Sequence, residues 1–274
     1  MDALKVARLL VVDGNIRAQS SNAQDDWQER ILAICALFSD NKPEGDCPEL
    51  LFVQPVNKDF IGVVRAQGYP LMYYFIIVSR ELYDFVHDPF LIAERFPAEW
   101  NLRGSIPELE WQPEPWQPRT IDQLTEVFRT GDTPFLLGGA QVLVDGGSIR
   151  LRGDAPALKT MRDLWLFLPD SVRRIVWPAT LAFNNQLGFR LVGLAPSNRK
   201  NTPGMLDEEG VRDYPEGVYE SSLHLALQAR DESSLQKLLN RRDGSATLRL
   251  AFLILILLMV TFILANIIGR MGAP

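Results

Sequence analysis

Histidines are the first residues to consider for acid–base chemistry, because the 274 residues contain just two of them. His87 lies in the stretch FVHDPF, at a predicted junction between two helices, and His224 lies on a later predicted helix. Asp88 follows His87 directly, but its position before Pro89 is typical of a helix N-cap. Adjacency in the sequence therefore does not make His87 and Asp88 a catalytic pair.

Acidic side chains are numerous but gather in predicted loops, where such runs usually face solvent. Binding of a divalent cation is the alternative role for these runs. The cysteines and histidines are too far apart for any zinc-binding spacing, so we predict no metal and no cofactor. Cys35 falls on the apolar side of a helical pattern, and a disulfide with Cys47 is the alternative to a core thiol. The acidic runs are Glu108, Glu110 and Glu114, and Asp207, Glu208 and Glu209.

The densest cluster of functional side chains is the stretch RDLWLFLPDSVRRIVWPATLAFNN, residues 162–185. Arg173 and Arg174 occur there beside Trp165 and Trp177, a combination that suits an acidic partner or nucleotide phosphates. The alternative places the tryptophans in the core and the arginines on the surface. Arg173 and Arg174 are therefore candidate partner-binding residues.

A second candidate surface is the stretch PELEWQPEPWQP, residues 107–118. Its prolines are incompatible with a regular helix or a central strand, so we predict an extended connector. Trp111 and Trp116 then either offer a recognition surface to a partner or fasten this loop to its own domain. Both are candidate partner-binding residues.

Glycine pairs occur in LLGGAQVLVDGG, but the chain has no recognisable phosphate-binding loop or nucleophile elbow. The glycines indicate turns, and DGG at 145–147, between two alternating runs, predicts a β-hairpin.

The net charge of the chain restricts the class of partner. Without residues 250–274, which hold one arginine, the 28 basic residues fall to 27 against 34 acidic ones, a net charge of −7. This acidic body argues against general nucleic-acid binding.

An uncharged apolar run extends from residue 250 to residue 268. As a helix, its 19 residues rise about 28 Å, close to the hydrocarbon thickness of about 30 Å. No polar stripe interrupts it, so we predict a transmembrane helix rather than a core helix. Arg241, Arg242 and Arg249 precede it, and the positive-inside rule then places the large N-terminal body of this single-pass, tail-anchored protein in the cytoplasm. The predicted anchor includes Leu250, Phe252, Ile256, Phe262 and Ile268.

Hydrophobic periodicity predicts the elements that position these residues. Thr120 and Gln123 form a predicted capping box at the start of a helix that ends at Gly131. A helix over 25–38 buries one face, formed by Trp27, Ile31, Ile34, Cys35 and Phe38. Further helices are predicted over 79–86, 88–96, 155–168 and 169–177, with Asp170 as a cap of the last. Strands are predicted over 4–12, 49–56, 60–68, 69–79, 179–185 and 189–196, and in the hairpin over 135–153.

These patterns predict that residues 1–195 form one α+β soluble domain, a mostly antiparallel sheet with packed helices. A polar region rich in proline, glycine and asparagine follows at 196–213 and indicates a flexible linker. Residues 214–249 predict a juxtamembrane helical hairpin. The transmembrane helix at 250–268 and a short tail at 269–274 complete the chain.

The pattern of helix, LP, short arginine-bearing helix and PATLAF resembles the N-terminal domains of bacterial GTPase-associated proteins, over residues 134–185. This resemblance implies an interaction module within a multi-protein conflict or signalling system. The arrangement of domain, helical hairpin and C-terminal anchor also resembles uncharacterised single-pass membrane proteins of planctomycete-type bacteria. Neither resemblance assigns a site residue.

Two function classes follow from these observations. The leading prediction is a non-catalytic scaffold that recruits a cytoplasmic protein partner to the surface of a lipid bilayer. It depends on the anchor, the missing nucleotide and triad motifs, and the tryptophan-bearing segment at 107–118. The alternative is a membrane-tethered, hydrolase-like enzyme whose site combines scattered carboxylates with His87.

Overall fold

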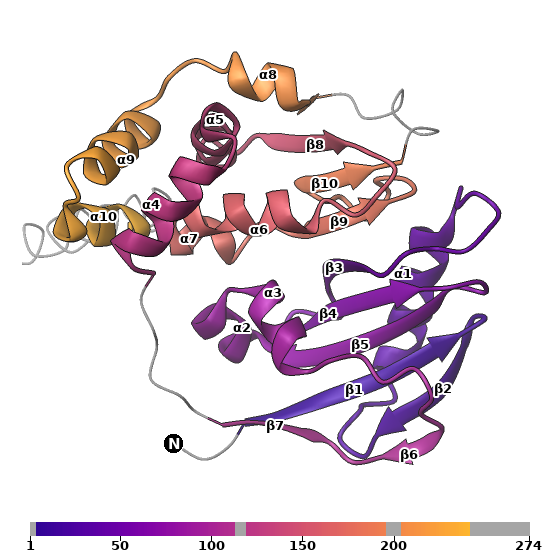
Figure 1. Ribbon diagram of the computed structural model, residues 1–274. Coiled ribbons are helices and arrows are strands. Elements are labelled where there is room, and N and C mark those ends of the chain that lie inside the picture. The colour runs from indigo at the N-terminus through magenta and orange to yellow at the C-terminus, as the bar shows by residue number, and fades with distance from the viewer. Residues whose placement is uncertain (1–3, 113–118, 196–203, 242–274) are drawn as a thin grey trace, which may run out of the picture.

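The computed structural model describes residues 4–112, 119–195 and 204–241 and shows two halves that share one sheet (Figure 1). We call residues 4–112 the N-terminal half, and residues 119–195 and 204–241 the C-terminal half. The N-terminal half contains β1 (Leu4–Val12), β2 (Asn15–Ser20), α1 (Trp27–Ser39), β3 (Leu50–Pro55), β4 (Phe60–Gln67), β5 (Met72–Ser79), α2 (Arg80–Val86), α3 (Pro89–Arg95), β6 (Gly104–Ile106) and β7 (Leu109–Trp111).

The C-terminal half is richer in helix. It contains α4 (Ile121–Thr130), α5 (Thr133–Val144), β8 (Ser148–Arg152), α6 (Leu158–Phe167), α7 (Asp170–Arg173), β9 (Pro178–Ala182), β10 (Leu191–Leu194), β11 (Met205–Leu206), α8 (Glu208–Arg212), α9 (Val218–Gln228) and α10 (Glu232–Leu239).

The sheet follows the strand order β11-β8-β10-β9-β3-β4-β5-β1-β2-β6, with β7 paired to β1. Strands β3, β4, β5, β1 and β2 pair antiparallel in this order, whereas the edge strand β6 runs parallel to β2. Strands β9, β10, β8 and β11 run parallel to one another. The predicted α+β class with a mostly antiparallel sheet is therefore confirmed, and the parallel strands make the sheet mixed.

Helices cover both faces of the antiparallel strands. On one face α1 packs its apolar side against these strands, and on the other face lie α2 and α3. Six consecutive residues of β5 are therefore buried, which explains its continuous apolar sequence. The core under α2 and α3 continues into the C-terminal half through Leu137, Leu164, Leu223 and Leu235.

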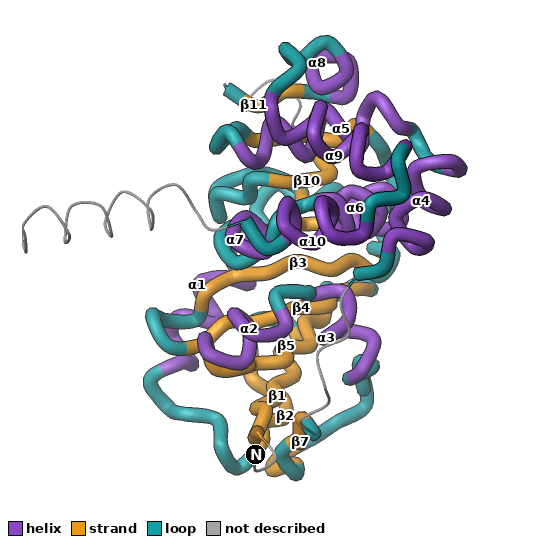
Figure 2. Tube along the Cα trace, turned by 90° about the vertical axis from the view of Figure 1, so that its left-hand side faces the viewer, coloured by secondary structure: helices purple, strands orange, loops and turns teal. Residues whose placement is uncertain are grey.

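The two halves meet where β3 pairs with β9 through Phe52 and Ala179. Next to this pair, the side-chain hydroxyl of Thr180 on β9 takes the place of a backbone group and hydrogen-bonds to the backbone of β3. Its Oγ1 accepts a hydrogen bond from the Leu51 amide (2.9 Å) and donates one to the Leu51 carbonyl oxygen (3.2 Å). Figure 2 shows β3 between the helices of the C-terminal half and the remaining strands of the N-terminal half.

Local patterns located several elements correctly. Helix α1 buries the five residues predicted for its core face. The carboxylate of Asp88 accepts a hydrogen bond from the Leu91 amide and caps α3, which begins at Pro89. Thr120 Oγ1 likewise accepts a hydrogen bond from the Gln123 amide at the start of α4. Each cap signal lies within four residues, and the apolar face of α1 repeats along a single helix, so none of the three needs knowledge of the tertiary fold.

The predicted hairpin over 135–153 is wrong. Residues 133–144 form helix α5, capped by Asp132, and DGG ends this helix instead of turning between two strands. Gly146 has a φ of +88°, and the Gly147 amide donates a hydrogen bond to the Val142 carbonyl oxygen. An apolar run that is buried all round has no polar stripe, so its periodicity does not distinguish a helix from a strand.

The C-terminal helices pack onto the rest of the fold. Of the predicted linker at 196–213, the structure describes 204–213, where β11 and α8 form. Of the predicted hairpin at 214–249, it describes the part up to residue 241. There α9 and α10 bury Leu223, Leu227 and Leu235 in the common core. The described residues include no helix that is long and apolar enough to cross a bilayer, and the predicted span at 250–268 and tail at 269–274 fall outside them.

Candidate functional site

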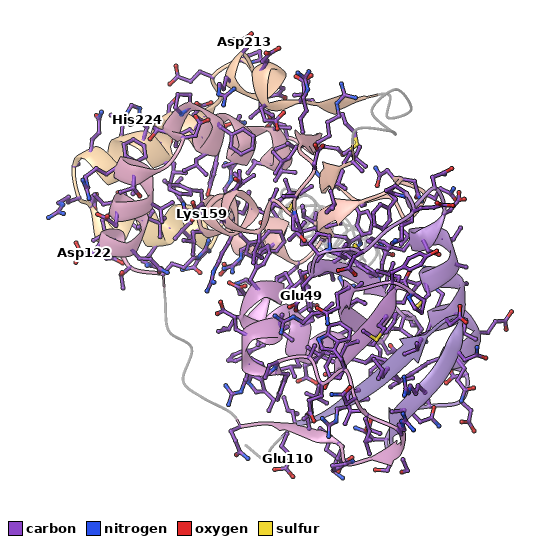
Figure 3. The ribbon with its side chains drawn as sticks, turned by 45° about the vertical axis from the view of Figure 1, so that its right-hand side comes forward. Glu49, Glu110, Asp122, Lys159, Asp213 and His224 are labelled. Atoms are coloured by element: carbon purple, nitrogen blue, oxygen red, sulfur yellow. The ribbon has the colours of Figure 1, made fainter. Side chains whose placement is uncertain are left out.

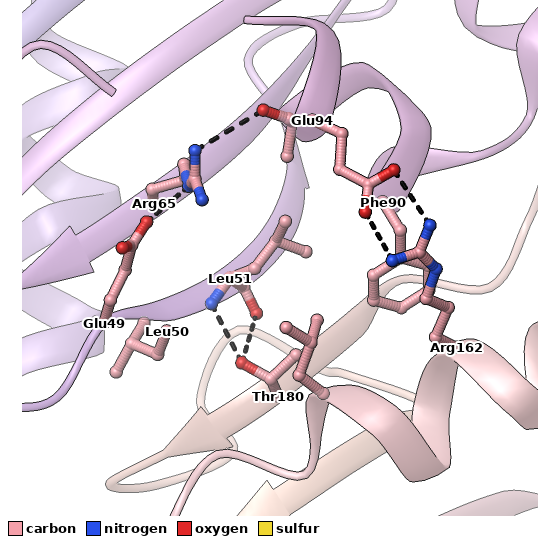
Figure 4. Close-up of a pocket in the computed structure, with 10 residues that line it drawn as sticks. Glu49, Leu50, Leu51, Arg65, Phe90, Glu94, Arg162 and Thr180 are labelled. Carbon is pink, nitrogen blue, oxygen red and sulfur yellow. Dashed lines mark hydrogen bonds and ion pairs between the residues drawn. The ribbon is translucent and has the colours of Figure 1, made fainter. Parts of the chain in front are cut away.

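A pocket of about 270 Å³ opens where the two halves meet, and we call it the junction pocket. Strands β3 and β4 and helix α3 line it from the N-terminal half, and α6 and β9 from the C-terminal half (Figure 4). Its apolar surface is formed by Leu50, Leu51, Phe90, Ala93 and Leu158. The hydroxyl of Thr180 also reaches the pocket but is already hydrogen-bonded to the backbone of β3.

Two ion pairs form the rim of the junction pocket. Arg65 Nε lies 2.5 Å from Glu49 Oε1, and Arg65 Nη1 donates a hydrogen bond to the Ala93 carbonyl oxygen (3.4 Å). Both terminal nitrogens of the Arg162 guanidinium donate hydrogen bonds to the Glu94 carboxylate, and Nη2 lies 2.8 Å from Oε2. The first pair lies within the N-terminal half, whereas the second joins α6 to α3 across the junction. The rim thus carries two positive and two negative side chains on a pocket with an apolar surface.

A separate group of ionisable residues lies buried at the same interface between the halves. This buried polar cluster consists of His87, Asp88, Arg119, Asp170 and Arg173. Nε2 of His87 lies 2.8 Å from Asp170 Oδ1, and Arg119 Nη2 donates a hydrogen bond to the same oxygen (2.6 Å). Arg173 Nη2 pairs with Asp88 Oδ2 at 2.5 Å. Each of these contacts except the bond between Arg119 and Asp170 joins the two halves.

The backbone supports this cluster. His87 ends α2 in the left-handed region, with φ 36° and ψ 34°, which is uncommon for a residue other than glycine. Nε1 of Trp165 donates a hydrogen bond to the His87 carbonyl oxygen (3.0 Å). Arg119 also donates hydrogen bonds to the carbonyl oxygens of Leu166 and Leu168, which lie on either side of Phe167 at the end of α6. The side chains are therefore held by both local backbone and distant partners.

Burial controls the protonation of the cluster. It lowers the pKa of His87, and the hydrogen bond to Asp170 only partly opposes this effect. Burial also lowers the pKa of Arg119 to about 10, assisted by the nearby charge of Arg173. For Asp170, burial raises the pKa, but the hydrogen bond from His87 and the charge of Arg119 outweigh it, so the net pKa is lowered. Burial thus favours the neutral form of His87, and its neighbours favour the ionised form of Asp170.

His87 and Asp170 have the residue types and the spacing of a catalytic dyad, but a substrate cannot reach the histidine. His87 is 2 % exposed and Arg173 is 1 % exposed, and neither lines the junction pocket. A general base must reach the proton that it abstracts from a substrate. The buried polar cluster is therefore a structural joint between the halves, and Asp170 accepts contacts within it instead of capping α7.

The candidate partner-binding residues divide into buried and exposed positions. Trp111 is 5 % exposed and packs against Phe96, with Arg95 over its ring at 4.4 Å, so it fastens the loop to the domain. Arg173 is buried in the polar cluster. The prediction that these two residues form a partner surface is therefore wrong. Arg174 is exposed, and Trp116 lies outside the described residues.

The remaining sequence candidates also serve local structure. The ring of His224 lies 5.6 Å from that of Phe128, and Figure 3 places it far from Glu49 at the junction. Asp207 caps α8 and pairs with Arg152. In the part of the chain that the structure describes, no His, Cys, Asp or Glu residues gather in a group that could hold a metal ion. Both cysteines are buried free thiols.

Comparison with known proteins adds no assignment, because no family model and no curated protein matches the sequence. The site therefore has to be judged on its own geometry. Sequence reasoning missed its four rim residues, Glu49, Arg65, Glu94 and Arg162. Arg65, Glu94 and Arg162 are single charged residues in ordinary strands or helices, and Glu49 directly precedes β3. Only the fold brings residues as distant as Glu94 and Arg162 together.

Proposed function

We propose that the chain is a membrane-anchored interaction module that binds a cytoplasmic protein partner and performs no chemistry itself. The observation that carries this proposal is the composition of the junction pocket. Its charged side chains neutralise one another in pairs, and Thr180 is satisfied by backbone groups. The described residues that line it include no histidine, cysteine, serine, tyrosine or lysine that could act as a nucleophile or a proton carrier.

The rival enzyme would combine scattered carboxylates with a histidine. The burial of His87 in the polar cluster removes it from contact with a substrate in the junction pocket. The carboxylates of the pocket, Glu49 and Glu94, are each paired with an arginine. A pocket that offers complementary charges and apolar surface suits binding better than bond cleavage.

The anchor adds a spatial constraint to this proposal. Helix α10 ends at Leu239, and the apolar run begins at residue 250. A fully extended chain over this interval reaches at most about 40 Å. Insertion of residues 250–268 would hold the end of α10 within that distance of the bilayer.

Two experiments test the two parts of the proposal. For the anchor, carbonate extraction should leave the full chain in the membrane pellet, and Ile256→Arg should shift it to the supernatant, because an arginine at mid-span opposes insertion. Release of the unmodified chain by carbonate would refute the anchor. For the module, affinity capture with the detergent-solubilised full chain should yield a stoichiometric protein partner. A broad hydrolase and nucleotide-turnover screen of the same sample should detect no turnover, and turnover that His87→Gln abolishes without a change in Tm would favour the enzyme instead.

A further inference from the structure

We infer that the junction pocket receives one apolar side chain of a protein partner, from a segment that carries an acidic and a basic residue close to it. This inference rests on the proposed function and specifies the chemistry of its partner. Three properties of the pocket support it: its size, the balance of charge on its rim, and the exposure of the groups that would make the contacts.

Size restricts the occupant. Pockets for small-molecule ligands typically have volumes of about 300–1,000 Å³. The junction pocket, at about 270 Å³, lies just below that range and suits a group the size of a single side chain. Apolar anchors inserted into such pockets contribute much of the affinity in protein interfaces. The apolar surface of Leu51, Phe90 and Leu158 provides matching contacts.

Charge restricts the sequence around this anchor. Two carboxylates and two guanidinium groups share the rim, so a nucleotide or another polyanion meets Glu49 and Glu94, and a polycation meets Arg65 and Arg162. A segment with one charge of each sign avoids both conflicts and finds an opposite charge for each of its own. Figure 4 shows the Arg65 pair and the Arg162 pair on different sides of the pocket, which allows both signs to be met at once.

Three of the four rim groups are accessible enough to exchange partners, whereas Arg65 is 24 % exposed. The side chains of Glu94 and Arg162 are each 50 % exposed, and that of Glu49 is 41 % exposed. Ion pairs at this exposure contribute little to the stability of a fold. Their charged atoms can therefore turn to a bound segment without loss of the structure, whereas a bidentate arginine contact with a carboxylate of the partner would add specificity.

Selection from a random heptapeptide library on phage tests this inference without an assumed partner. The bait is the detergent-solubilised full chain. We expect enriched peptides to share an apolar residue with one acidic and one basic residue within three positions of it. A resynthesised peptide is then titrated by fluorescence anisotropy against three variants of α6, all at exposed positions.

The variants separate the pocket from the rest of the helix surface. Arg162→Gln and Leu158→Gln should each weaken peptide binding at least about tenfold. Lys159→Gln, whose side chain is 81 % exposed and pairs with Asp163, is the matched control and should change binding less than about twofold. All three should keep the Tm of the unmodified chain, because none of the positions is buried.

Three results would overturn the inference. They are a failure to enrich any peptide, enrichment of purely anionic or purely apolar peptides, and binding that both Arg162→Gln and Leu158→Gln leave unchanged. The partner from the affinity capture distinguishes this failure from that of the proposed function. If these two variants retain the partner at full stoichiometry, the chain is an interaction module but the junction pocket is not its docking site.

Discussion

Replacement of Arg173 by methionine should destabilise the fold far more than the same change at its neighbour Arg174. Arg173 is 1 % exposed, pairs with Asp88 across the two halves and lies over the Trp165 ring at 5.8 Å. Removal of one partner from a buried ion pair typically costs about 3–5 kcal/mol, because the other charge stays buried. Asp88 keeps its hydrogen bond from the α3 backbone and is 20 % exposed, so we expect the lower end, about 3 kcal/mol.

Thermal unfolding gives a direct measurement of this loss. For a domain of this size, about 3 kcal/mol corresponds to a fall in Tm of about 6–12 °C. Arg174→Met changes an exposed residue and should stay within about 0.5 kcal/mol of the unmodified chain. If both variants unfold at the same temperature, the structural role of Arg173 is refuted. In a double-mutant cycle, Asp88→Asn should lose much of its own cost once Arg173 is absent, since the two then no longer act as a pair.

Three further predictions concern the joint, the sheet and the C-terminal helices. Burial lowers the pKa of His87 below 6.5, so the unfolded chain binds more protons than the folded one below that pH. The urea midpoint should therefore be constant above pH 6.5 and fall as the pH drops below it, and His87→Gln should flatten this slope. Gly193→Ala places a Cβ 2.3 Å from a backbone oxygen of β9 and should lower the yield of folded protein on expression, whereas Gly153→Ala, with its nearest contact at 3.6 Å, should not. Leu235→Ala empties a fully buried site on α10 and should cost about 2–5 kcal/mol in chemical denaturation, but Leu225→Ala, 65 % exposed, should be neutral.

The sequence predicted those features that depend on neighbouring residues. The buried face of α1 follows from a pattern along one helix, and the N-caps Asp88 and Thr120 follow from patterns within one turn. Each pattern satisfies the backbone or the core locally, so the tertiary fold leaves it unchanged. The same reasoning identified β5 as a buried strand, since a continuous apolar run of that length needs cover on both faces.

The candidate site could not be predicted in the same way. Asp170 stands at the start of a short helix and carries a sequence signal for a cap, but Arg119 approaches it from 51 residues away. The charge of a side chain fixes which partners it prefers and says nothing of which one the fold supplies. Likewise, the exposed rim residues Glu94 and Arg162 look like any solvated surface charge until α3 and α6 are brought together.

The position of the two polar groups suggests why the halves form one unit. The buried polar cluster fixes α2 and α3 to α6 and α7 from within, and the ion pair of Glu94 with Arg162 joins α3 to α6 at the surface. Helix α3 therefore has a rigid, buried attachment at its start and an exposed, exchangeable one near its end. Rigid support beneath an adaptable rim is what a binding site requires, because the support keeps the pocket open while the rim adjusts to its partner. On this reasoning, loss of a buried contact should lower the stability of the fold, and loss of the exposed contact should change only what the pocket binds.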